Sequence, residues 1–491
     1  MSTNGAHTEP LTLQLASGRR LTVEGSNLIL HDPNPSANKK PKPDSNSRQS
    51  IPLYNILWSQ VSGGNIVVEF AHLSSKSKFN VEKWTLPIQE PATSEQAGSG
   101  PETFTTELLS RSYAKAQQKR KAYVLINPNS GPGNGVKIWE RDVKPLFQAA
   151  RMDLDIVFLK RGGEATELVE QMDINRYDTV IPCSGDGTPF EVFNGFAKRP
   201  DARLALSKIA VGHIPCGSGN AMACNLYGSH RPTYAALALI KGVVTPLDLV
   251  SITQGDTRIV SFLSQALGVI AESDLGTEHL RWMGSARFDF GVVSRLFRKK
   301  AYPCDIAMQV VVEKPDVKEH YRRHASEPSL AAAQADDAAE GNGLPKLKYG
   351  TVKDKLPAGW EFVSYDKIGT FYCGTMAYMA PNVNFFPAAV TADGCIDLIT
   401  INSDMSTSAA LKTFMSVDSN KFFDSPNVHY KKVAAYRIIP RNQKDGYISI
   451  DGERVPFEPF QAEVHQGLGR VISKRGVYEA EGPANWEKQS T

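Results

Sequence analysis

A single carboxylate stands between two glycines in the stretch Ser184-Gly185-Asp186-Gly187, after an apolar run and before a helix-like pattern. A tight turn needs at most one glycine, which can adopt backbone conformations that other residues avoid. The second glycine indicates that something large approaches the backbone beside Asp186. These residue types and their spacing therefore predict a ligand at a strand-to-helix turn.

Two further glycine-rich stretches stand between a strand-like run and a helix-like pattern: INPNSGPGNG, residues 126–135, and CGSGNA, residues 216–221. Consecutive N–H groups of such loops can bind phosphate, and Ser218 can donate to a phosphate oxygen. The first stretch lacks the Gly-Lys-Ser/Thr ending of a Walker loop, and it is not GxGxxG. Each loop alone could be a plain turn, but the three together predict a nucleotide site without a P-loop.

The elements that must position these loops lie in residues 120–246, where strand-like and helix-like segments alternate. Such alternation predicts a parallel sheet with helices on both faces. Each glycine-rich stretch follows a strand, and in such sheets ligands bind beyond the carboxyl ends of the strands. We expect an α/β domain over residues 116–246.

The rest of the chain is mostly strand-like. Short alternating stretches in residues 11–89 predict antiparallel strands with disordered loops, within a β-rich N-terminal region 1–105. Residues 247–480 predict a second, mainly antiparallel domain, with RIVSFLSQALGVIA, residues 258–271, as a strand. A polar insert at about 313–358 is expected to be structureless, disordered or regulatory. The predicted fold class is α/β plus β, with a β-rich extension.

Composition excludes several classes of protein. The net charge of +3 over 491 residues is too small to indicate nucleic-acid binding. The first residues carry no signal-peptide pattern, and no run of about 18 apolar residues could span a bilayer. We therefore expect a membrane to be contacted only at its surface. The cysteines form no CxxC pair, which predicts reduced thiols in an intracellular protein; they are Cys183, Cys216, Cys224, Cys304, Cys373 and Cys395.

Three motifs together resemble the diacylglycerol kinase catalytic superfamily, and within it the sphingosine kinases, or long-chain-base kinases. They are NPxSGxG from Asn127, SGDGxxxEVxNG from Ser184 to Gly195, and GSGNA from Gly217 to Ala221. Diacylglycerol kinases usually show GTGND, with an acid where this chain has Ala221. Residues 269–288 are similar to the lipid-site segment of sphingosine kinases. The resemblance covers about residues 120–310 and 366–475.

The resemblance implies an ATP-dependent lipid kinase that uses Mg²⁺ and phosphorylates the primary hydroxyl of sphingosine or a related sphingoid base. Asp186 would take the proton of that hydroxyl while ATP and the lipid meet above it. Because such transfer is driven mainly by positioning and charge neutralisation, a weak base suffices. A diacylglycerol or ceramide kinase, or a non-catalytic lipid-binding scaffold, stays an alternative.

The resemblance also implies the site residues. Substrate would contact Ser184, Asp186 and, through its amine, Asp274, with Glu272 and Glu278 as alternatives and a helix N-cap as the structural reading of Asp274. Asp451 would bind the metal or the nucleotide. The nucleotide would be bound by Asn127, Asn129, Ser130, Gly131, Ser184, Gly185, Gly187, Glu191, Gly217, Ser218, Gly219, Asn220, Arg281, Arg287, Asp451, Gly452 and Glu453.

Some positions depart from the animal sphingosine kinases. Asn129, Pro132 and Asn134 stand in the first loop where basic residues are common. In the next predicted strand-to-helix connection, Leu159 and Glu164 replace the usual Thr and His. Phosphate binding by this half of the site is expected to be weaker, unless Lys160 or Arg161 compensates.

Two segments predict partners beyond the substrate. FGVVSRLFRKKAYP, residues 290–303, mixes apolar and basic residues and resembles an interfacial segment attracted to anionic lipid, although an ordinary core element fits equally. RRHASEP, residues 322–328, resembles a kinase site at Ser326 and a docking sequence for a phospho-dependent adaptor. We expect a cytoplasmic protein with peripheral association to intracellular or plasma membranes.

Overall fold

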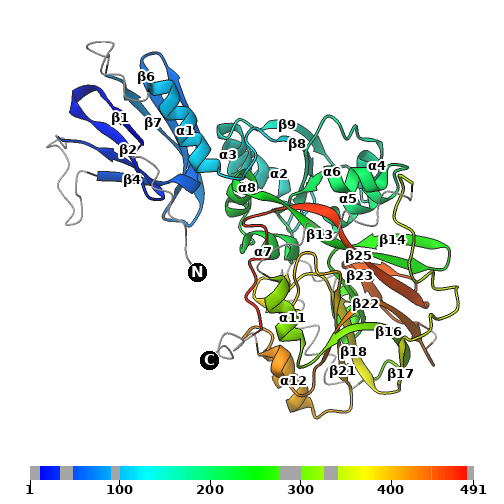
Figure 1. Cartoon of the computed structure of the whole chain (residues 1–491). Helices are drawn as coiled ribbons and strands as arrows, with labels where there is room; N and C mark the ends of the chain where they lie inside the picture. The colour runs from blue at the N-terminus through cyan, green and yellow to red at the C-terminus, as the bar shows by residue number, and fades with distance from the viewer. Residues whose placement is uncertain are drawn as a thin grey trace. The chain divides into compact units, whose positions relative to one another are not determined.

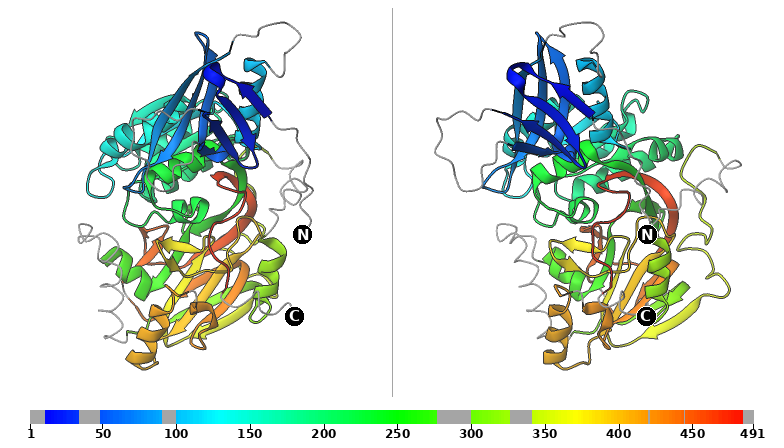
Figure 2. Two further views of the ribbon diagram at one scale, coloured as in Figure 1. Left: turned by 90° about the vertical axis from the view of Figure 1, so that its left-hand side faces the viewer. Right: turned by 60° about the vertical axis from the view of Figure 1, so that its left-hand side comes forward.

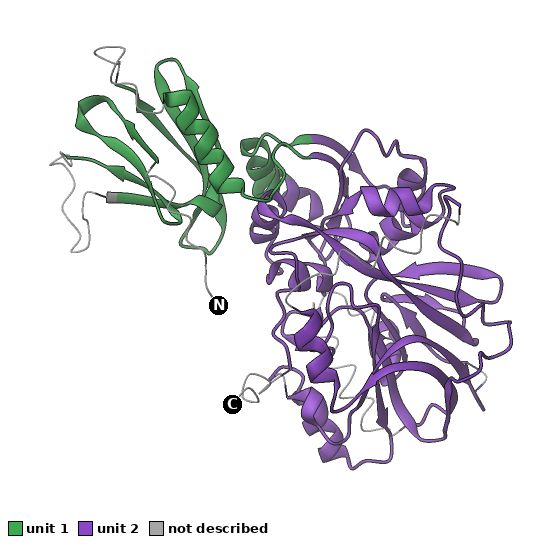
Figure 3. Ribbon diagram, in the orientation of Figure 1, with its two compact units in different colours: residues 1–120, 140–153 green, residues 121–139, 154–491 purple. Residues whose placement is uncertain are grey.

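The computed structural model contains two compact units (Figures 1 and 3). Unit 1 comprises residues 1–120 and 140–153, and unit 2 comprises residues 121–139 and 154–491. The structure describes residues 11–33, 48–89, 100–276, 300–325, 341–419, 421–443 and 445–483.

Unit 1 is built on two antiparallel sheets and a helix. The first sheet contains β1 (Leu11–Gln14), β2 (Arg20–Glu24), β3 (Asn27–His31) and β4 (Arg48–Pro52). The second contains β5 (Ile56–Ser62), β6 (Asn65–Leu73) and β7 (Phe79–Pro87), and the helices are α1 (Pro101–Tyr113) and α3 (Lys144–Ala149). Apolar side chains of both sheets and of α1 form one buried cluster, including Leu21, Ile66 and Phe104. The antiparallel strands predicted for residues 11–89 are confirmed.

Unit 2 begins with the parallel strands that carry the glycine-rich loops. Its first strands are β8 (Lys121–Ile126), β9 (Asp153–Phe158), β10 (Thr179–Ser184), β11 (Ala210–Val211) and β12 (Ile214–Pro215). Strand β10 pairs in parallel with β8, β11 and β12. The carboxyl ends of these strands therefore lie at the same end of the sheet. The helices that alternate with or directly follow these strands are α2 (Gly135–Ile138), α4 (Glu164–Gln171), α5 (Gly187–Ala197), α6 (Ala202–Lys208), α7 (Ala221–Tyr227) and α8 (Pro232–Lys241).

Most of the remaining strands of unit 2 are antiparallel and extend the same sheet (Figures 1 and 2). Among the described residues this sheet has 16 strands, whereas β19 (Tyr378–Ala380) and β20 (Val383–Asn384) pair with each other in a separate sheet. The connection is made by β25, which pairs in parallel with β11 and antiparallel with β13 and β22. The predicted limits 1–105, 116–246 and 247–480 stay predictions. The further strands are β13 (Val243–Gln254), β14 (Thr257–Ser261), β15 (Ser264–Gly268), β16 (Cys304–Glu313), β17 (Glu361–Tyr365), β18 (Ile368–Gly374), β21 (Ile396–Asn402), β22 (His429–Pro440), β23 (Ile448–Ile450), β24 (Glu453–Val455) and β25 (Phe460–Ser473).

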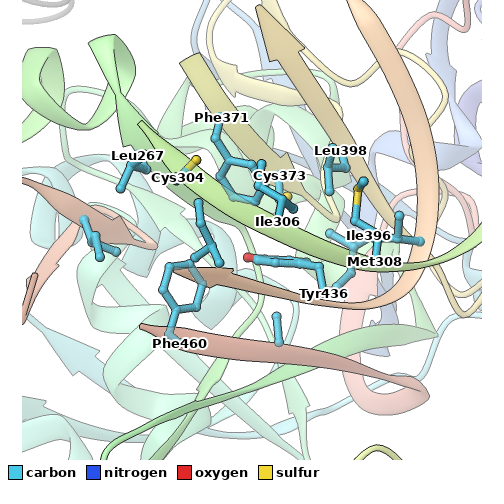
Figure 4. Close-up of a cluster of buried hydrophobic side chains, with 14 of the residues drawn as sticks. Leu267, Cys304, Ile306, Met308, Phe371, Cys373, Ile396, Leu398, Tyr436 and Phe460 are labelled. Atoms are coloured by element: carbon cyan, nitrogen blue, oxygen red, sulfur yellow. The ribbon is translucent and has the colours of Figure 1, made fainter. Parts of the chain in front are cut away.

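The antiparallel part encloses its own apolar core (Figure 4). The ring of Tyr436 packs edge-to-face on Phe371 and Phe460, with centroids 5.2 and 5.8 Å apart. Its hydroxyl donates to Oε1 of Gln265 at 3.0 Å, so the buried polar atom is satisfied.

Two predictions about local structure are wrong. Residues 258–271 are not one strand, because β14 and β15 are followed by the helix α9 (Val269–Gly276). The insert is not structureless throughout. Its first part contains α11 (Val317–His324), and Glu463 accepts hydrogen bonds from the backbone N–H groups of Lys348 and Tyr349 at 2.7 and 2.9 Å. Buried polar side chains of the sheet thus hold the described end of the insert.

All six cysteines lie within the described part of the chain as free, buried thiols. None of the described helices combines the length and the apolar character needed to cross a bilayer.

A buried ion cluster stabilises the antiparallel part. Nζ of Lys432 donates to Asp393 at 2.7 Å and to Asp397 at 3.0 Å, and all three side chains are at most 1% exposed. Nε2 of His320, on α11, lies 3.0 Å from Asp393. Because an unpaired buried charge is costly, the lysine is needed as long as the two carboxylates are present.

We expect Lys432→Ala to lower the free energy of unfolding by about 3–5 kcal/mol, because it leaves two buried carboxylates without their cation. Lys431→Ala is the matched control, since Lys431 pairs with Glu361 at the surface and such pairs contribute about 0–1 kcal/mol. Chemical denaturation of both variants measures the difference. Equal losses would contradict the role given to the buried cluster.

Candidate active site

The three glycine-rich loops meet backbone to backbone at the edge of the parallel sheet. A Cβ atom on Gly217 would lie 2.5 Å from Cα of Gly185, which no real side chain tolerates. A Cβ atom on Gly131, whose φ is +57°, would lie 2.5 Å from the carbonyl oxygen of Cys216. Glycine is therefore required by close approach at these positions, and the loops form one site rather than three independent turns.

The carboxylate of Asp186 bridges two of these loops. Its Oδ2 accepts from the N–H of Ala221 at 3.0 Å, and its Oδ1 accepts from the N–H of Met222 at 3.1 Å. These are free N–H groups of the first turn of α7, where a negative charge is favoured. Gly219 keeps the approach open, since a Cβ atom there would lie 3.2 Å from Oδ2. The side chain of Asp186 is half-buried, and its two hydrogen bonds hold the carboxylate against the start of α7, which follows the loop after β12.

Amide side chains fix α7 and the loop before it. Asn220, with a φ of +54°, accepts from the N–H of Gly217 at 2.9 Å and donates to its carbonyl at 2.7 Å. Asn225 donates to the carbonyl of Tyr378 at 2.7 Å and accepts from its N–H at 2.9 Å, which ties α7 to β19 (Tyr378–Ala380). Both polar atoms of the Asn220 side chain therefore hold the loop, and its predicted contact with the nucleotide stays a prediction.

The Asp451-Gly452-Glu453 turn divides into a buried anchor and an exposed acid. Asp451 is 3% exposed and accepts four hydrogen bonds, from the hydroxyl of Ser261 at 2.6 Å and from the N–H groups of the next three residues at 2.8–3.0 Å. Burial raises the pKa of Asp451 to about 6 against these hydrogen bonds. Asp451 thus anchors the turn between β14 and β15, and its predicted contact with the metal or the nucleotide stays a prediction.

Glu453 is the member of this turn that faces the glycine-rich loops. It is exposed, and its Oε1 would lie 3.2 Å from a Cβ atom on Gly187, the first residue of α5. The carboxylates of Asp186 and Glu453 therefore belong to one site.

Asn194 clamps α5 to the antiparallel part. Its Nδ2 donates to the carbonyl of Val260 at 2.8 Å, and its Oδ1 accepts from the N–H of Val260 at 2.9 Å. Val260 lies on β14, directly before the turn that Asp451 anchors. The helix that begins beside Asp186 and the turn that carries Glu453 are thus linked through hydrogen bonds.

Asp274 lies inside α9, not at its N-cap, so the structural reading of this residue is wrong. Its Oδ2 accepts from the hydroxyl of Ser449 at 3.2 Å and would lie 3.8 Å from a Cβ atom on Gly452. This places Asp274 beside the turn that carries Glu453. Glu272 is bound by Lys300, and Glu278 lies outside the described residues.

Other predicted residues have structural partners. Ser184 is fully buried and its hydroxyl donates to the carbonyl of Gly185 at 2.8 Å. Glu191 accepts from the N–H of Ala165 at 3.1 Å, in the first turn of α4. The predicted contacts of Ser184 and Glu191 with substrate or nucleotide stay predictions. Asn127 accepts from the N–H of Asn129 at 3.0 Å within the first loop. Arg281, Arg287 and Ser326 lie outside the described residues, as do residues 290–299 of the predicted membrane segment.

The basic residues expected to compensate in the first half of the site are exposed. Arg161 donates to the carboxylate of Glu167, which neutralises part of its charge. Glu164 accepts from the N–H of Lys160. The predicted compensation by Lys160 or Arg161 stays a prediction.

His213 was not predicted from the sequence as a site residue. It contacts the backbone of Ser184, directly before Gly185. It is completely buried, and its Nε2 lies 3.0 Å from the carbonyl oxygen of Ser184. Burial lowers the pKa of His213, against the charge of Asp186 and the hydrogen bond to Ser184. His213 is a single histidine in an apolar run of sequence. Because its hydrogen-bond partner lies 29 residues away in the chain, the sequence does not indicate the contact.

The chain matches two sequence profiles and is similar in sequence to several kinases. The profile of the diacylglycerol kinase catalytic domain matches residues 121–252, and that of a domain of unknown function matches residues 11–114. Sphingoid long chain base kinase 4 of Schizosaccharomyces pombe is 32% identical, over 86% of this chain and 88% of its own length. Sphingoid long chain base kinase 5 of Saccharomyces cerevisiae is 34% identical over 76% of this chain, but the match spans only 62% of that relative.

More distant proteins share the fold. Sphingosine kinase 1 of Homo sapiens is 26% identical, over 75% of this chain and 94% of its own length. A solved structure from Bacillus anthracis, proposed to be a diacylglycerol kinase, superimposes with a TM-score of 0.51 at 18% identity. It covers 73% of this chain and 97% of its own. The α/β plus β architecture predicted from the sequence is confirmed at this level.

We expect Gly217→Ala to lower the free energy of unfolding by about 1–3 kcal/mol, because the added methyl group overlaps Cα of Gly185. Gly162→Ala is the control: no atom lies within 4 Å of a Cβ atom there, and its φ is not positive. Chemical denaturation measures both variants. Equal stability of the two would show that the loops are not packed as described.

Proposed function

The chain belongs to the sphingoid long-chain-base kinases, and we propose that it transfers the γ-phosphoryl group of ATP to the primary hydroxyl of sphingosine or a related sphingoid base. The observation that carries this proposal is the carboxylate of Asp186, held by two N–H groups of α7 where three glycine-rich loops meet. An intact acid in this position argues against a non-catalytic scaffold.

The loops suit the polyphosphate of ATP. Gly131, Gly185 and Gly217 bring backbone close to backbone, so N–H groups are presented without side chains in the way. The half-buried Ser218 adds a hydroxyl donor in the loop after β12. Such a site binds phosphate by its backbone, and so needs no Walker lysine.

Asp186 receives the proton of the lipid hydroxyl as the phosphoryl group is transferred. Because the carboxylate is a weak base for an alcohol, the proton moves late, after most of the bond to the leaving group is broken. The two N–H donors hold the carboxylate in place, so little reorganisation is needed at that moment. Positioning and charge neutralisation then account for most of the rate.

Mg²⁺ fits the acids that face this site. Magnesium prefers carboxylate oxygens together with substrate phosphates, and Glu453 is exposed beside Gly187 while Asp186 is half-buried nearby. Asp451 is 3% exposed, and its oxygens accept four hydrogen bonds from residues 261–264, which makes Glu453 the more accessible acid of this turn. We propose Glu453 and Asp186 as the protein groups next to the metal, which would neutralise charge on the phosphates.

We place part of the long chain of the substrate at a small pocket beside the start of α9. The pocket is partly open to solvent, and its lining mixes apolar side chains with polar ones such as Lys300 and Asn402. Its lining includes Val269 at the start of α9 and Ala410 and Phe414 on α12 (Thr407–Met415). Because α9 also carries Asp274, one helix can contact both the chain and the amine of a sphingoid base. Diacylglycerol and ceramide lack that amine charge, which favours the sphingoid base over them.

We also propose a cytoplasmic location with reversible contact to intracellular or plasma membranes, since a substrate with one long apolar chain partitions into bilayers. Of the basic residues in the predicted membrane segment, Lys300 is described, and it pairs with Glu272. Co-sedimentation with anionic vesicles tests the contact, and failure to pellet with them would contradict it. A phospho-dependent adaptor at Ser326 stays a prediction.

Asp186→Asn should lower kcat by about 10²–10⁴-fold, because the proton acceptor is lost while the side-chain shape is kept. The measurement is steady-state kinetics with ATP and sphingosine. ATP affinity and melting temperature of the same variant serve as controls for folding. A variant that keeps more than half of the wild-type rate would remove Asp186 from catalysis.

Asp274→Asn should raise the KM for sphingosine more than tenfold and leave the KM for ATP nearly unchanged. The reason is that removing one partner of a buried charge pair costs about 2–5 kcal/mol. Glu272→Gln is the matched control, because Glu272 lies on the same helix but pairs with Lys300. If Asp274→Asn leaves the sphingosine constant unchanged, or if Glu272→Gln raises it equally, Asp274 does not bind the amine.

A further inference from the structure

Two buried thiols touch beneath the catalytic loops. Sγ of Cys183 lies 3.4 Å from Sγ of Cys216. Cys183 is the second-last residue of β10, and Cys216 directly follows β12. Cys183 is completely buried and Cys216 is 5% exposed, so the pair lies on the protein side of the site.

The pair stands where all three glycine-rich loops join the sheet. The carbonyl of Cys183 accepts from the N–H of Asn127 at 3.1 Å, at the start of the first loop. The N–H of Cys216 donates to the carbonyl of Ser184 at 2.8 Å, and the carbonyl of Cys216 is the group that Gly131 approaches. A disulfide at this place would therefore join the two backbone segments that hold all three loops.

We propose that Cys183 and Cys216 form an oxidisable dithiol, a modification site at which a disulfide switches the kinase off. With a peroxide as oxidant, the Cys216 thiol takes one oxygen atom to become a sulfenic acid and one water is released. The Cys183 sulfur then attacks the Cys216 sulfur, the S–S bond forms, and a second water leaves. Two thiols thus lose two electrons and two protons, and the peroxide is reduced to water.

The order of these steps follows from exposure. The reactive species is the thiolate. The hydrogen bond with Cys216, together with burial, raises the pKa of the Cys183 thiol, so Cys183 resists direct oxidation. Cys216 has the exposed surface and precedes the half-buried Gly217. Oxidation therefore starts at Cys216, and Cys183 acts as the resolving thiol.

Disulfide formation would disturb the catalytic geometry. The sulfurs must approach by about 1.4 Å, because an S–S bond is about 2.05 Å long. The backbones of Gly185 and Gly217 are already in contact and cannot absorb that movement without shifting. Asp186 and the N–H groups that hold it lie on the same two loops. Because a misplacement of about 1 Å can cost about 10²-fold in rate, the oxidised enzyme should be at least tenfold less active.

The test treats the purified full-length protein with hydrogen peroxide, removes the oxidant, and measures kinase activity before and after dithiothreitol. The same samples are alkylated, digested and searched by mass spectrometry for a peptide linked through Cys183 and Cys216. We expect the linked peptide to appear as activity falls at least tenfold, and both changes to reverse with dithiothreitol. The activity readout rests on the proposed function, whereas the linked peptide does not, so the two can fail separately.

Variants assign the effect to the pair. Cys216→Ala and Cys183→Ala, each compared with its own reduced activity, should lose the reversible inactivation, and either one suffices if the other fails to fold. Cys224→Ala is the matched control, because Cys224 is a buried thiol on α7 near Asp186 and its removal should leave inactivation intact. Absence of the linked peptide in the wild type would overturn the proposal. So would reversible inactivation of the Cys216→Ala and Cys183→Ala variants to the same extent as the wild type.

Discussion

The active site depends on one contact, the packing of the Gly185 backbone against the Gly217 backbone at the edge of a parallel sheet. This contact brings Asp186 within reach of two N–H groups at the start of α7, and those hydrogen bonds fix the carboxylate. The parallel strands β8, β10 and β12 make the contact possible, because their carboxyl ends share one edge. The three glycine-rich loops begin at the carboxyl ends of these strands.

Buried polar groups hold the antiparallel part against this edge. Asn194 binds both backbone groups of Val260, and Asp451 binds the turn that follows it. These interactions leave Glu453 as the exposed acid beside Gly187. Two acids close together in the sequence thus have different tasks: the buried carboxylate shapes the turn, and the exposed one faces the site.

The features that could be predicted from the sequence depend on neighbouring residues or on a repeating pattern. Glycines at strand ends and the alternation of strand and helix indicated the parallel edge, the three loops and Asp186, because these signals lie within a few residues of each other. The tasks of Asp451 and Asn194 could not be predicted, since Asp451 and Ser261 are 190 residues apart and Asn194 and Val260 are 66 apart. Ser184 and Asn220 are polar residues in a ligand motif, yet their hydrogen bonds are internal. An apolar run cannot distinguish a strand from a buried helix, which explains the error at α9.

The most direct test offers the purified protein ATP, Mg²⁺ and an equimolar mixture of sphingosine, phytosphingosine, ceramide and diacylglycerol, and identifies the products by mass spectrometry. The account predicts phosphate on the primary hydroxyl of the amine-bearing bases, with far less on ceramide and diacylglycerol. Preferential phosphorylation of diacylglycerol or ceramide would contradict it, and so would the absence of any phosphorylated lipid.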